Sequence, residues 1–391
     1  MIRSSRRSSF QRLTLALLAL ILSASLAAAQ DSQFEAISAR MRQYVQQDQM
    51  SGAVTLVGHN GKIVHLSAVG KADVEENTPM QEDSMFCIAS MTKPITATAM
   101  MILQDEGKLS IDDPVEKYIP AFAEAKLRAG EPVRELTIRH LLTHTSGLGG
   151  SQQCEGSLAQ TAQELAAQPF DFQPGQRWQY SPGLNVAGRI VEIVSGQPYE
   201  KFLAERIFQP LGMRDTTFHP TVEQQKRIVT LYRPGEDGEG LAAADHWLNR
   251  VSPDRVPNPS GGLFSTAPDM FRFYQMILDG GTHDGKQIVS SDSVRAMTTL
   301  QSGKLSTGFT PGCGWGLGWC LVRDPQGVSE SLSASTFGHG GAFGTQGWID
   351  PEKKMIFVLM IQRTDFGNSD GSDVRGEFQR IAVEKLSEGS R

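Results

Sequence analysis

The sequence predicts an α+β fold, in which one antiparallel sheet is flanked by terminal helices and carries a mostly helical insertion. Two patterns support this prediction: β-rich runs lie near both ends of the chain, and helical periodicity fills the stretch between them. Length supports it too, because 391 residues, 39% of them hydrophobic and 20% charged, are enough to bury such a core. The sheet must therefore pair segments that are distant in sequence.

The N-terminal segment has the layout of a secretory signal peptide. Arginines precede an apolar run at 15–22, and small residues follow up to Ala29. We therefore expect residues 1–29 to be a signal peptide cleaved after Ala29, a periplasmic or secreted protein, and no membrane span in the mature chain. Cleavage removes four arginines and no acidic residue, which lowers the formal net charge from −6 to −10. Such an acidic protein is not expected to bind nucleic acid.

A helix and a hairpin are the first elements expected in the mature chain. Apolar residues recur at helical spacing from Phe34 to Val45, which predicts an amphipathic helix. Two β-rich runs follow at 53–57 and 63–69, and Asn60-Gly61 lies between them. Asn-Gly between apolar runs is the strongest short-range hairpin signal, so these runs are expected to pair.

The stretch 87–120 is the one around which the chain is organised. It contains Ser90-Met91-Thr92-Lys93, a hydroxyl and an amine three positions apart. On a helix this spacing places both groups on one face, where the amine can take the serine proton. Pro94 fits only near a helix start, so Ser90 is expected at the mouth of a buried helix that stops at Gly107. A helix cap beside a solvated lysine is the structural alternative.

The rest of the chain divides into a helical part and a β-rich end. Helices are expected at 136–145, 184–194 and 270–278, and 233–259 has the composition of a long surface loop. Strands are expected near the C-terminus at 315–322, 343–349 and 355–361. A final amphipathic helix is expected at 373–386.

Export would permit disulfides among the cysteines, which could pair in three ways. A straight strand between Cys313 and Cys320 would hold these two too far apart to bond, so free thiols are expected. The four cysteines are Cys87, Cys154, Cys313 and Cys320.

The segment from Cys87 to Pro120 resembles the active-serine segment of the serine β-lactamase and penicillin-binding-protein superfamily. It is most similar to the branch that holds class C β-lactamases, D-amino-acid peptidases and lactamase-like esterases. The resemblance continues, in the right order, through 141–148, 261–267, and His339-Gly340-Gly341 followed by Gly347-Trp348. It implies a β-lactamase-like fold in one domain, 30–391, with an α/β part at about 30–88 and 298–391 and a helical part at about 89–297.

The same resemblance implies roles for individual residues. Ser90 would be the acylated nucleophile, with Lys93 as its proton partner. Tyr180 falls where the family places its tyrosine, which could act as a phenolate and later return a proton to the leaving group. A packed aromatic ring is the structural alternative. The N–H groups of Ser90 and Ala342 would form the oxyanion hole.

His339, Gly340 and Gly341 occupy the position of the family's third motif and would bind substrate. The glycines allow close approach of the backbone, and His339 could bind a carboxylate, tune Tyr180, or simply be a buried hydrogen-bonded histidine. The sequence departs from lactam-cleaving relatives here, because His339 replaces the lysine of Lys-Thr-Gly. It departs again where Pro182 replaces the amide of Tyr-x-Asn.

These departures favour an esterase or a short-peptide (D-amino-acid) hydrolase that works through an acyl-enzyme on Ser90. A β-lactamase or D-Ala-D-Ala carboxypeptidase is the alternative within the family, with a lactam or peptide as the small-molecule substrate. A catalytically inactive protein that binds cell-wall peptides is the alternative outside enzymes.

No cofactor or metal is expected: His140 and His144 are four apart on a probable helix, but no third ligand accompanies them.

Overall fold

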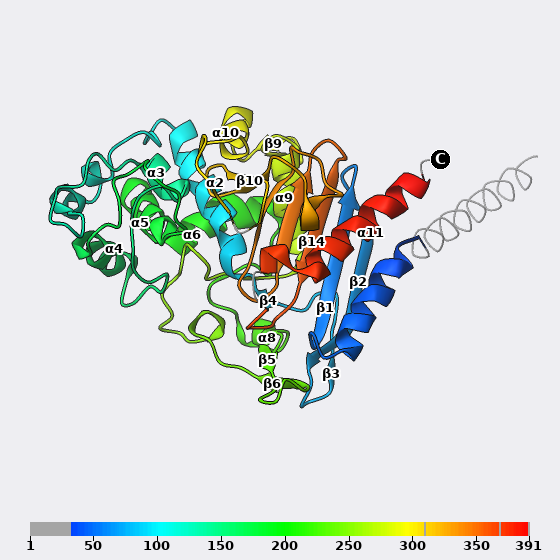
Figure 1. Ribbon diagram of the computed structural model, residues 1–391. Helices are drawn as coiled ribbons and strands as arrows, with labels where there is room; N and C mark the ends of the chain where they lie inside the picture. Colours follow the sequence, from blue (N-terminus) through cyan, green and yellow to red (C-terminus); the bar gives the residue numbers. More distant parts are fainter. Residues whose placement is uncertain (1–32, 309, 367–368, 390–391) are drawn as a thin grey trace, which may run out of the picture.

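The computed structural model describes residues 33–308, 310–366 and 369–389, so the expected signal peptide lies outside the described residues. An eight-stranded antiparallel sheet forms its centre, in the order β10-β11-β12-β13-β14-β1-β2-β3 (Figure 1). The expected α+β fold, with a sheet built from both ends of the chain, is confirmed. The strands are β1 (Gly52–His59), β2 (Lys62–Asp73), β3 (Thr78–Pro79), β10 (Cys313–Trp315), β11 (Cys320–Val322), β12 (Phe337–Gly340), β13 (Gln346–Asp350) and β14 (Met355–Met360).

The N-terminal hairpin forms as predicted and joins the C-terminal strands. His59 pairs with Lys62 across a turn in which Asn60 has φ 51° and Gly61 has φ 78°, the left-handed conformations that a two-residue hairpin turn needs. On its other side β1 pairs with β14, with Leu56 opposite Val358. Through this pairing, strands from the two ends of the chain join in one sheet.

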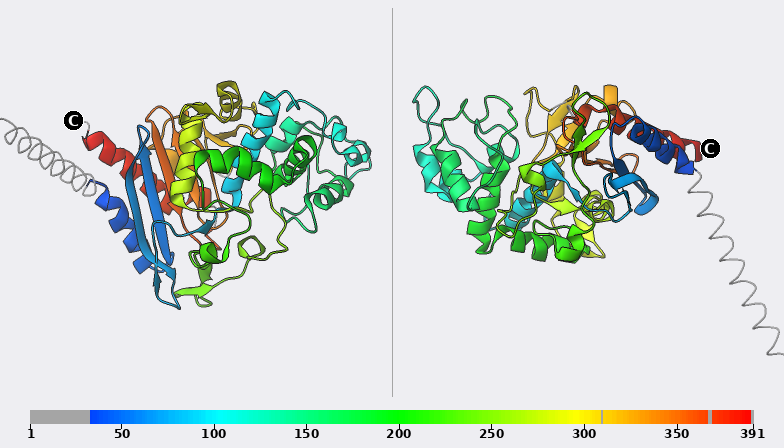
Figure 2. Two further views of the ribbon diagram at one scale, coloured as in Figure 1. Left: turned by 180° about the vertical axis from the view of Figure 1, so that it is seen from behind. Right: turned by 90° about the horizontal axis from the view of Figure 1, so that it is seen from below.

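Helices cover both faces of the sheet. The helix at 33–46 and α11 (Asp373–Gly389) lie side by side across one face (Figure 1), and both were predicted. Phe34 and Phe378 from these helices share a buried cluster with Phe357 of β14. On the other face lies α9 (Ala267–Leu278), seen from behind in Figure 2. Within the described ranges, no helix combines the length and the apolar character that a membrane crossing requires.

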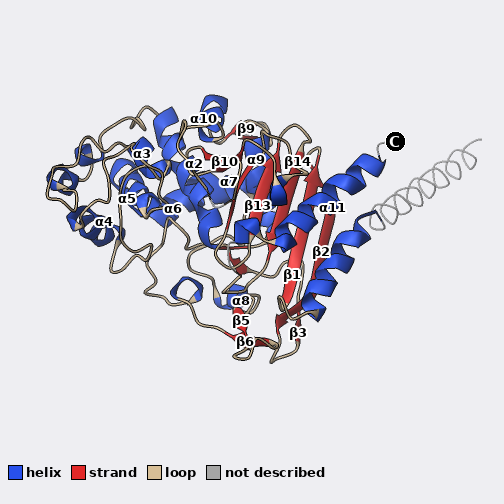
Figure 3. Ribbon diagram, viewed as in Figure 1, coloured by secondary structure: helices blue, strands red, loops and turns tan. Residues whose placement is uncertain are grey.

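The region between the two groups of sheet strands is mostly helical (Figure 3). The helices expected at 184–194 and 270–278 are present as α5 and α9. The helices of this region are α2 (Thr92–Asp105), α3 (Ile138–Leu142), α4 (Leu158–Ala167), α5 (Gly183–Ser195), α6 (Tyr199–Leu203), α7 (Gln209–Leu211), α8 (Val222–Gln225), α9 and α10 (Ser291–Met297). Three short strand pairs accompany them: β4 (Phe86–Cys87) with β7 (Phe264–Ser265), β5 (Tyr232–Pro234) with β6 (Leu241–Ala243), and β8 (Thr282–His283) with β9 (Lys286–Gln287).

The prediction of a surface loop at 233–259 is wrong in two respects. The stretch contains β6 and all of β5 but its first residue, and its last residues, Asn258 and Pro259, are buried. Asn258 is 2% exposed, because its side-chain amide bonds to backbone groups inside the protein. Polar composition predicted a loop correctly, but such a loop can enter the interior when its amides find partners.

The single strand predicted at 315–322 is in fact the hairpin β10–β11. Gly318 adopts φ 76° and allows the chain to reverse, so Trp315 pairs with Cys320. The hairpin brings Cys313 and Cys320 into a side-chain hydrogen bond, which holds the pKa of the Cys313 thiol down at about 7. Both remain free thiols, as do the other two cysteines, but the straight strand that was expected to separate them does not exist.

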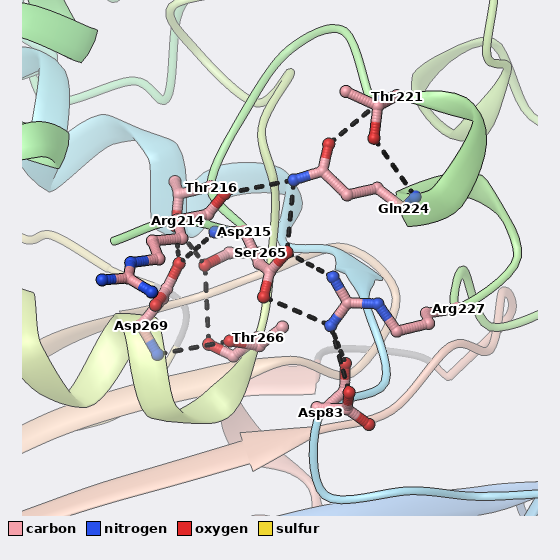
Figure 4. Close-up of polar contacts among 10 residues, drawn as sticks. All are labelled: Asp83, Arg214, Asp215, Thr216, Thr221, Gln224, Arg227, Ser265, Thr266 and Asp269. Carbon is pink, nitrogen blue, oxygen red and sulfur yellow. Dashed lines mark hydrogen bonds and ion pairs between the residues drawn. The ribbon is translucent and has the colours of Figure 1, made fainter. Parts of the chain in front are cut away.

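A polar network fixes the segment that precedes the α9 helix (Figure 4). The buried carboxylate of Asp269 accepts hydrogen bonds from the Asp215 backbone N–H at 2.7 Å and from the Thr216 hydroxyl at 3.0 Å. Arg227 bridges Asp215 and the Asp83 backbone carbonyl. β7 leads into α9 here and pairs with β4, which precedes the Ser90 turn. The network therefore helps to fix the strand pair next to Ser90.

Candidate active site

Ser90 lies at the mouth of a buried helix, as predicted. It occupies a single 3₁₀ turn, Ala89–Met91, that leads directly into α2. Ala89 has φ 44°, a left-handed conformation that a side chain tolerates only when the surroundings impose it. Every residue of α2 from Thr92 to Leu103 is buried, whereas Ser90 itself is partly exposed. The fold thus presents one hydroxyl to solvent at the end of a rigid, buried helix.

The Lys93 side chain lies beside that hydroxyl. Its Nζ is 3.2 Å from Ser90 Oγ and donates to the backbone carbonyl of Ser260 at 2.6 Å. Lys93 is 1% exposed, and this burial lowers the pKa of its amine from 10.5 to about 7. A substantial fraction of the amine is therefore neutral at pH 7 and able to accept a proton.

Tyr180 completes the group that the sequence predicted. Lys93 Nζ lies 4.5 Å from the centre of the Tyr180 ring, and the phenol shares a side-chain hydrogen bond with Ser90. Tyr180 is partly exposed, while its hydroxyl oxygen is buried. Burial raises the pKa of Tyr180 above its ordinary range, and the hydrogen bond from Ser90 offsets this only in part. The raised pKa favours the protonated phenol in the free protein, and the role of Tyr180 in proton transfer stays a prediction.

Aromatic rings hold Tyr180 in place. The His144 ring lies 4.4 Å from the Tyr180 ring, centre to centre, and the Trp315 ring lies 6.2 Å away. His144 has φ 58° and lies beyond the end of α3, so it does not share a helical face with His140. Each histidine accepts a hydrogen bond from a backbone N–H through Nδ1, at 3.1 Å in both cases. Among the described residues, no three side chains of metal-binding type come together.

His339 is buried and neutral. Its Nδ1 donates to the backbone carbonyl of Gly340 at 2.6 Å, which leaves Nε2 without a proton. Burial, with a smaller contribution from the nearby Lys93 charge, lowers the pKa of His339 to about 3. Of the three roles considered for His339, the structure matches the buried, hydrogen-bonded histidine, and a neutral imidazole has no positive charge to offer a carboxylate.

The glycines after His339 bring strand β12 against the Ser90 turn. A Cβ on Gly340 would lie 1.7 Å from Asp370 Oδ1, and one on Gly341 would lie 2.5 Å from the Ile88 carbonyl oxygen. Only glycine fits at these positions. Ala342 follows directly and is exposed.

Sequence reasoning missed three residues near the amine of Lys93: Ser260, Asn185 and Asn258. Ser260 contributes a backbone carbonyl, and the two asparagines bind its N–H, each at 3.0 Å. The Gly261-Gly262 pair directly after Ser260 was recognised, but no sequence pattern marks a backbone carbonyl as a partner of a buried amine. Asn258-Pro259 before those glycines was the available signal, since polar residues beside Pro and Gly form local hydrogen-bonded turns.

Comparison with known proteins agrees with this geometry. Residues 37–379 match the family model described as Beta-lactamase. Esterase EstB from Burkholderia gladioli is 32% identical over 383 residues, which cover 89% of this chain and 93% of EstB. A putative D-alanyl-D-alanine carboxypeptidase from Escherichia coli K12 is 29% identical, covering 78% of this chain and 76% of that protein. The structure of EstCE1, a hydrolase with promiscuous acyltransferase activity, has the same fold, with a TM-score of 0.77 at 23% identity over 91% of this chain and 99% of EstCE1. The chain therefore belongs to the beta-lactamase family and is a serine hydrolase of this β-lactamase-related group.

Proposed function

We propose that this protein is an exported hydrolase that forms an acyl-enzyme on Ser90 and acts on carboxylic esters or short D-amino-acid peptides. The observation that carries the proposal is a buried amine, with a pKa of about 7, lying 3.2 Å from a partly exposed serine hydroxyl. An amine in that state removes the proton that a serine must lose as it attacks a carbonyl carbon.

The reaction follows from the protonation states of the three side chains. Neutral Lys93 takes the Ser90 proton as Oγ bonds to the substrate carbonyl, and the N–H groups of Ser90 and Ala342 receive the developing oxyanion. The protonated phenol of Tyr180 then gives its proton to the leaving alkoxide, and the Lys93 ammonium restores the phenol. Water releases the acyl group by the same steps in reverse order.

Esters are favoured as substrates over β-lactams. Pro182 has no side-chain amide for a substrate, and neutral His339 cannot hold a lactam carboxylate by charge. The similarity to EstB supports the same choice. The similarity to a carboxypeptidase keeps D-Ala-D-Ala peptides as the second candidate.

A substrate panel tests this choice. We expect short-chain nitrophenyl esters to give a kcat/KM at least about tenfold above a chromogenic cephalosporin and D-Ala-D-Ala peptides, because the missing amide and cation each weaken binding of the latter by about 1 kcal/mol or more. The Ser90→Ala variant corrects for spontaneous hydrolysis. Faster turnover of the cephalosporin than of every ester would overturn the assignment as an esterase.

The pH dependence should report the Lys93 amine. Because burial lowers its pKa to about 7, the amine becomes neutral as the pH rises through that value. We expect kcat/KM for nitrophenyl butyrate to rise about tenfold per pH unit below this midpoint and to level off above it. The measurement is the pH profile of initial rates, corrected for chemical hydrolysis. A flat profile across the same range would exclude Lys93 as the base.

Replacing Tyr180 by phenylalanine should slow the enzyme in a way that depends on the leaving group. Alkoxides need a proton from the phenol, whereas nitrophenolate leaves without one. We therefore expect kcat to fall about 10²-fold for methyl or ethyl esters and less than about tenfold for nitrophenyl esters. Parallel assays of both ester types on folded protein, judged by circular dichroism, provide the comparison. Equal losses for both would remove the role of Tyr180 as proton donor.

A further inference from the structure

The amine of Lys93 has a second contact, which determines how it faces Ser90. Nζ donates to the Ser260 carbonyl at 2.6 Å, a shorter separation than its 3.2 Å to Ser90 Oγ. A neutral amine has two N–H bonds and one lone pair. When one N–H is held by an acceptor, rotation about the Cε–Nζ bond is restricted and the direction of the lone pair is limited. The position of this carbonyl therefore controls the base.

Two asparagine side chains fix the backbone just before that carbonyl, because both bind the N–H of Ser260. The Ser260 N–H donates to Asn185 Oδ1 and to Asn258 Oδ1, each at 3.0 Å. At their other ends, Asn185 Nδ2 and Asn258 Nδ2 both donate to the backbone carbonyl of Gln152, at 2.8 Å and 2.6 Å. The two amides thus form a double bridge between the same two backbone groups, and we call this arrangement the asparagine clamp.

The clamp is buried and well satisfied. Asn185 is 1% exposed and Asn258 is 2% exposed, while Ser260 is 2% exposed. Buried amides that lose a partner cost about 1–3 kcal/mol, so a fully bonded pair keeps one geometry strongly preferred. The hydroxyl of Thr96 adds a further restraint, because it donates to the neighbouring Pro259 carbonyl at 2.6 Å.

The clamp also joins the segments that carry the other catalytic groups. Asn185 lies in the first turn of α5, which begins directly after Tyr180-Ser181-Pro182. The Asn185 backbone N–H donates to the Pro182 carbonyl at 2.9 Å, so its side chain is fixed relative to the segment of Tyr180. The amide that the sequence lacks at position 182 is thus present one turn later, where it faces the protein instead of the substrate.

We propose that Asn185 and Asn258 are positioning residues, which hold the Ser260 carbonyl where it orients the Lys93 amine toward Ser90. The inference rests on the proposed function, since it assigns how the base of that reaction is aligned. Asn185 and Asn258 touch neither the Ser90 hydroxyl nor the Lys93 amine among the described contacts, and act through the backbone of Ser260, whose N–H they bind and whose carbonyl Lys93 contacts.

The first test is the pH profile of Asn185→Asp and Asn258→Asp. A carboxylate still accepts from the Ser260 N–H, but it places a negative charge behind the carbonyl that Lys93 contacts. A nearby negative charge stabilises the protonated amine of Lys93 and so raises its pKa. The midpoint of kcat/KM for nitrophenyl butyrate should therefore move up by about one pH unit in at least one variant. Asn60→Asp, in the β1–β2 turn, is the matched control and should keep the wild-type midpoint. A purely structural role would lower stability without moving the midpoint.

The second test removes one bridge without adding charge. Asn185→Ser is small and polar, and should fold. We expect its kcat to fall about tenfold with KM within about twofold of wild type, because the amine is misaligned in every turnover and substrate binding is untouched. Folded Asn185→Ser with wild-type kcat, together with unmoved midpoints in the folded Asp variants, would overturn the clamp.

Labelling with a fluorophosphonate separates failure of the clamp from failure of the proposed function. Wild-type protein should form an adduct on Ser90, and the Asn185→Ser variant should form it more slowly. If the wild type forms no Ser90-dependent adduct, the hydrolase mechanism itself is wrong. If both proteins form it at one rate, only the positioning role is wrong.

Discussion

Replacing Ser90 by alanine is expected to lower kcat for nitrophenyl esters by about 10³-fold or more while leaving the fold intact. The hydroxyl is the only group of the site that can carry the acyl chain in the proposed mechanism, and water attacking directly must cross the barrier that the acyl-enzyme avoids. Ser90 is partly exposed in a turn ahead of α2, so the loss of one oxygen leaves no buried cavity. Steady-state kinetics and circular dichroism on the same preparation measure both quantities.

The same variant separates the enzyme from a catalytically inactive peptide-binding protein. A fluorophosphonate or a fluorescent penicillin should label wild-type protein and leave Ser90→Ala unlabelled. Ser331→Ala is a suitable control, because this serine lies in the pocket between 327–331 and α11, apart from the contacts of Lys93. Absence of a Ser90-dependent adduct on intact protein would favour the binding protein.

Replacing Lys93 by methionine is expected to lower kcat by about 10²-fold or more and, at the same time, to stabilise the protein. Activity falls because methionine cannot accept the Ser90 proton. Stability rises because the wild-type chain buries an amine that is 1% exposed, whereas methionine fills similar space without a charge to desolvate.

The stabilisation should depend on pH with a defined sign. The pKa of Lys93 is about 7 in the folded protein, below its ordinary 10.5 in the unfolded chain. The unfolded state therefore binds more protons between these two values, and the stability of the wild type rises with pH across that window. Below about pH 7 burial of the charged amine lowers the free energy of unfolding by its full amount, and above about pH 10.5 this destabilisation is gone.

Thermal unfolding of both proteins at two pH values measures this dependence. The gain in Tm from Lys93→Met should be larger at about pH 6 than at about pH 9. Lys286→Met, at an exposed position in β9, should show no such difference. A Tm gain for Lys93→Met that is equal at both values would mean that the buried amine is not the titrating group.

The elements that follow from local pattern were predictable from the sequence. Asn60-Gly61 gave the hairpin, because a two-residue turn needs left-handed backbone at both positions. The apolar run after Ser90 gave the buried helix, and the serine-to-lysine spacing placed two side chains on one face. In each case the residues that predict an element lie within that element or within a few positions of it.

What escaped prediction depends on contacts between distant segments. The Ser260 carbonyl meets Lys93 from 167 positions away, and nothing in the sequence distinguishes one backbone carbonyl from another. The sequence left the role of His339 open, because its neutrality results from burial and from the nearby Lys93 charge, against the effect of its hydrogen bond to the Gly340 carbonyl. The turn at Gly318 was read as strand, since Trp, Leu and Trp around it outweighed two glycines in a run of apolar residues.

Trapping the intermediate is the decisive experiment. Wild-type protein is mixed with excess nitrophenyl ester, quenched in acid during turnover, and analysed by intact mass and peptide mapping. The mechanism predicts an added mass equal to the acyl group, located on the peptide that contains Ser90 and absent from Ser90→Ala. Acylation at any other side chain, or steady turnover with no covalent species in protein that is active, would contradict it.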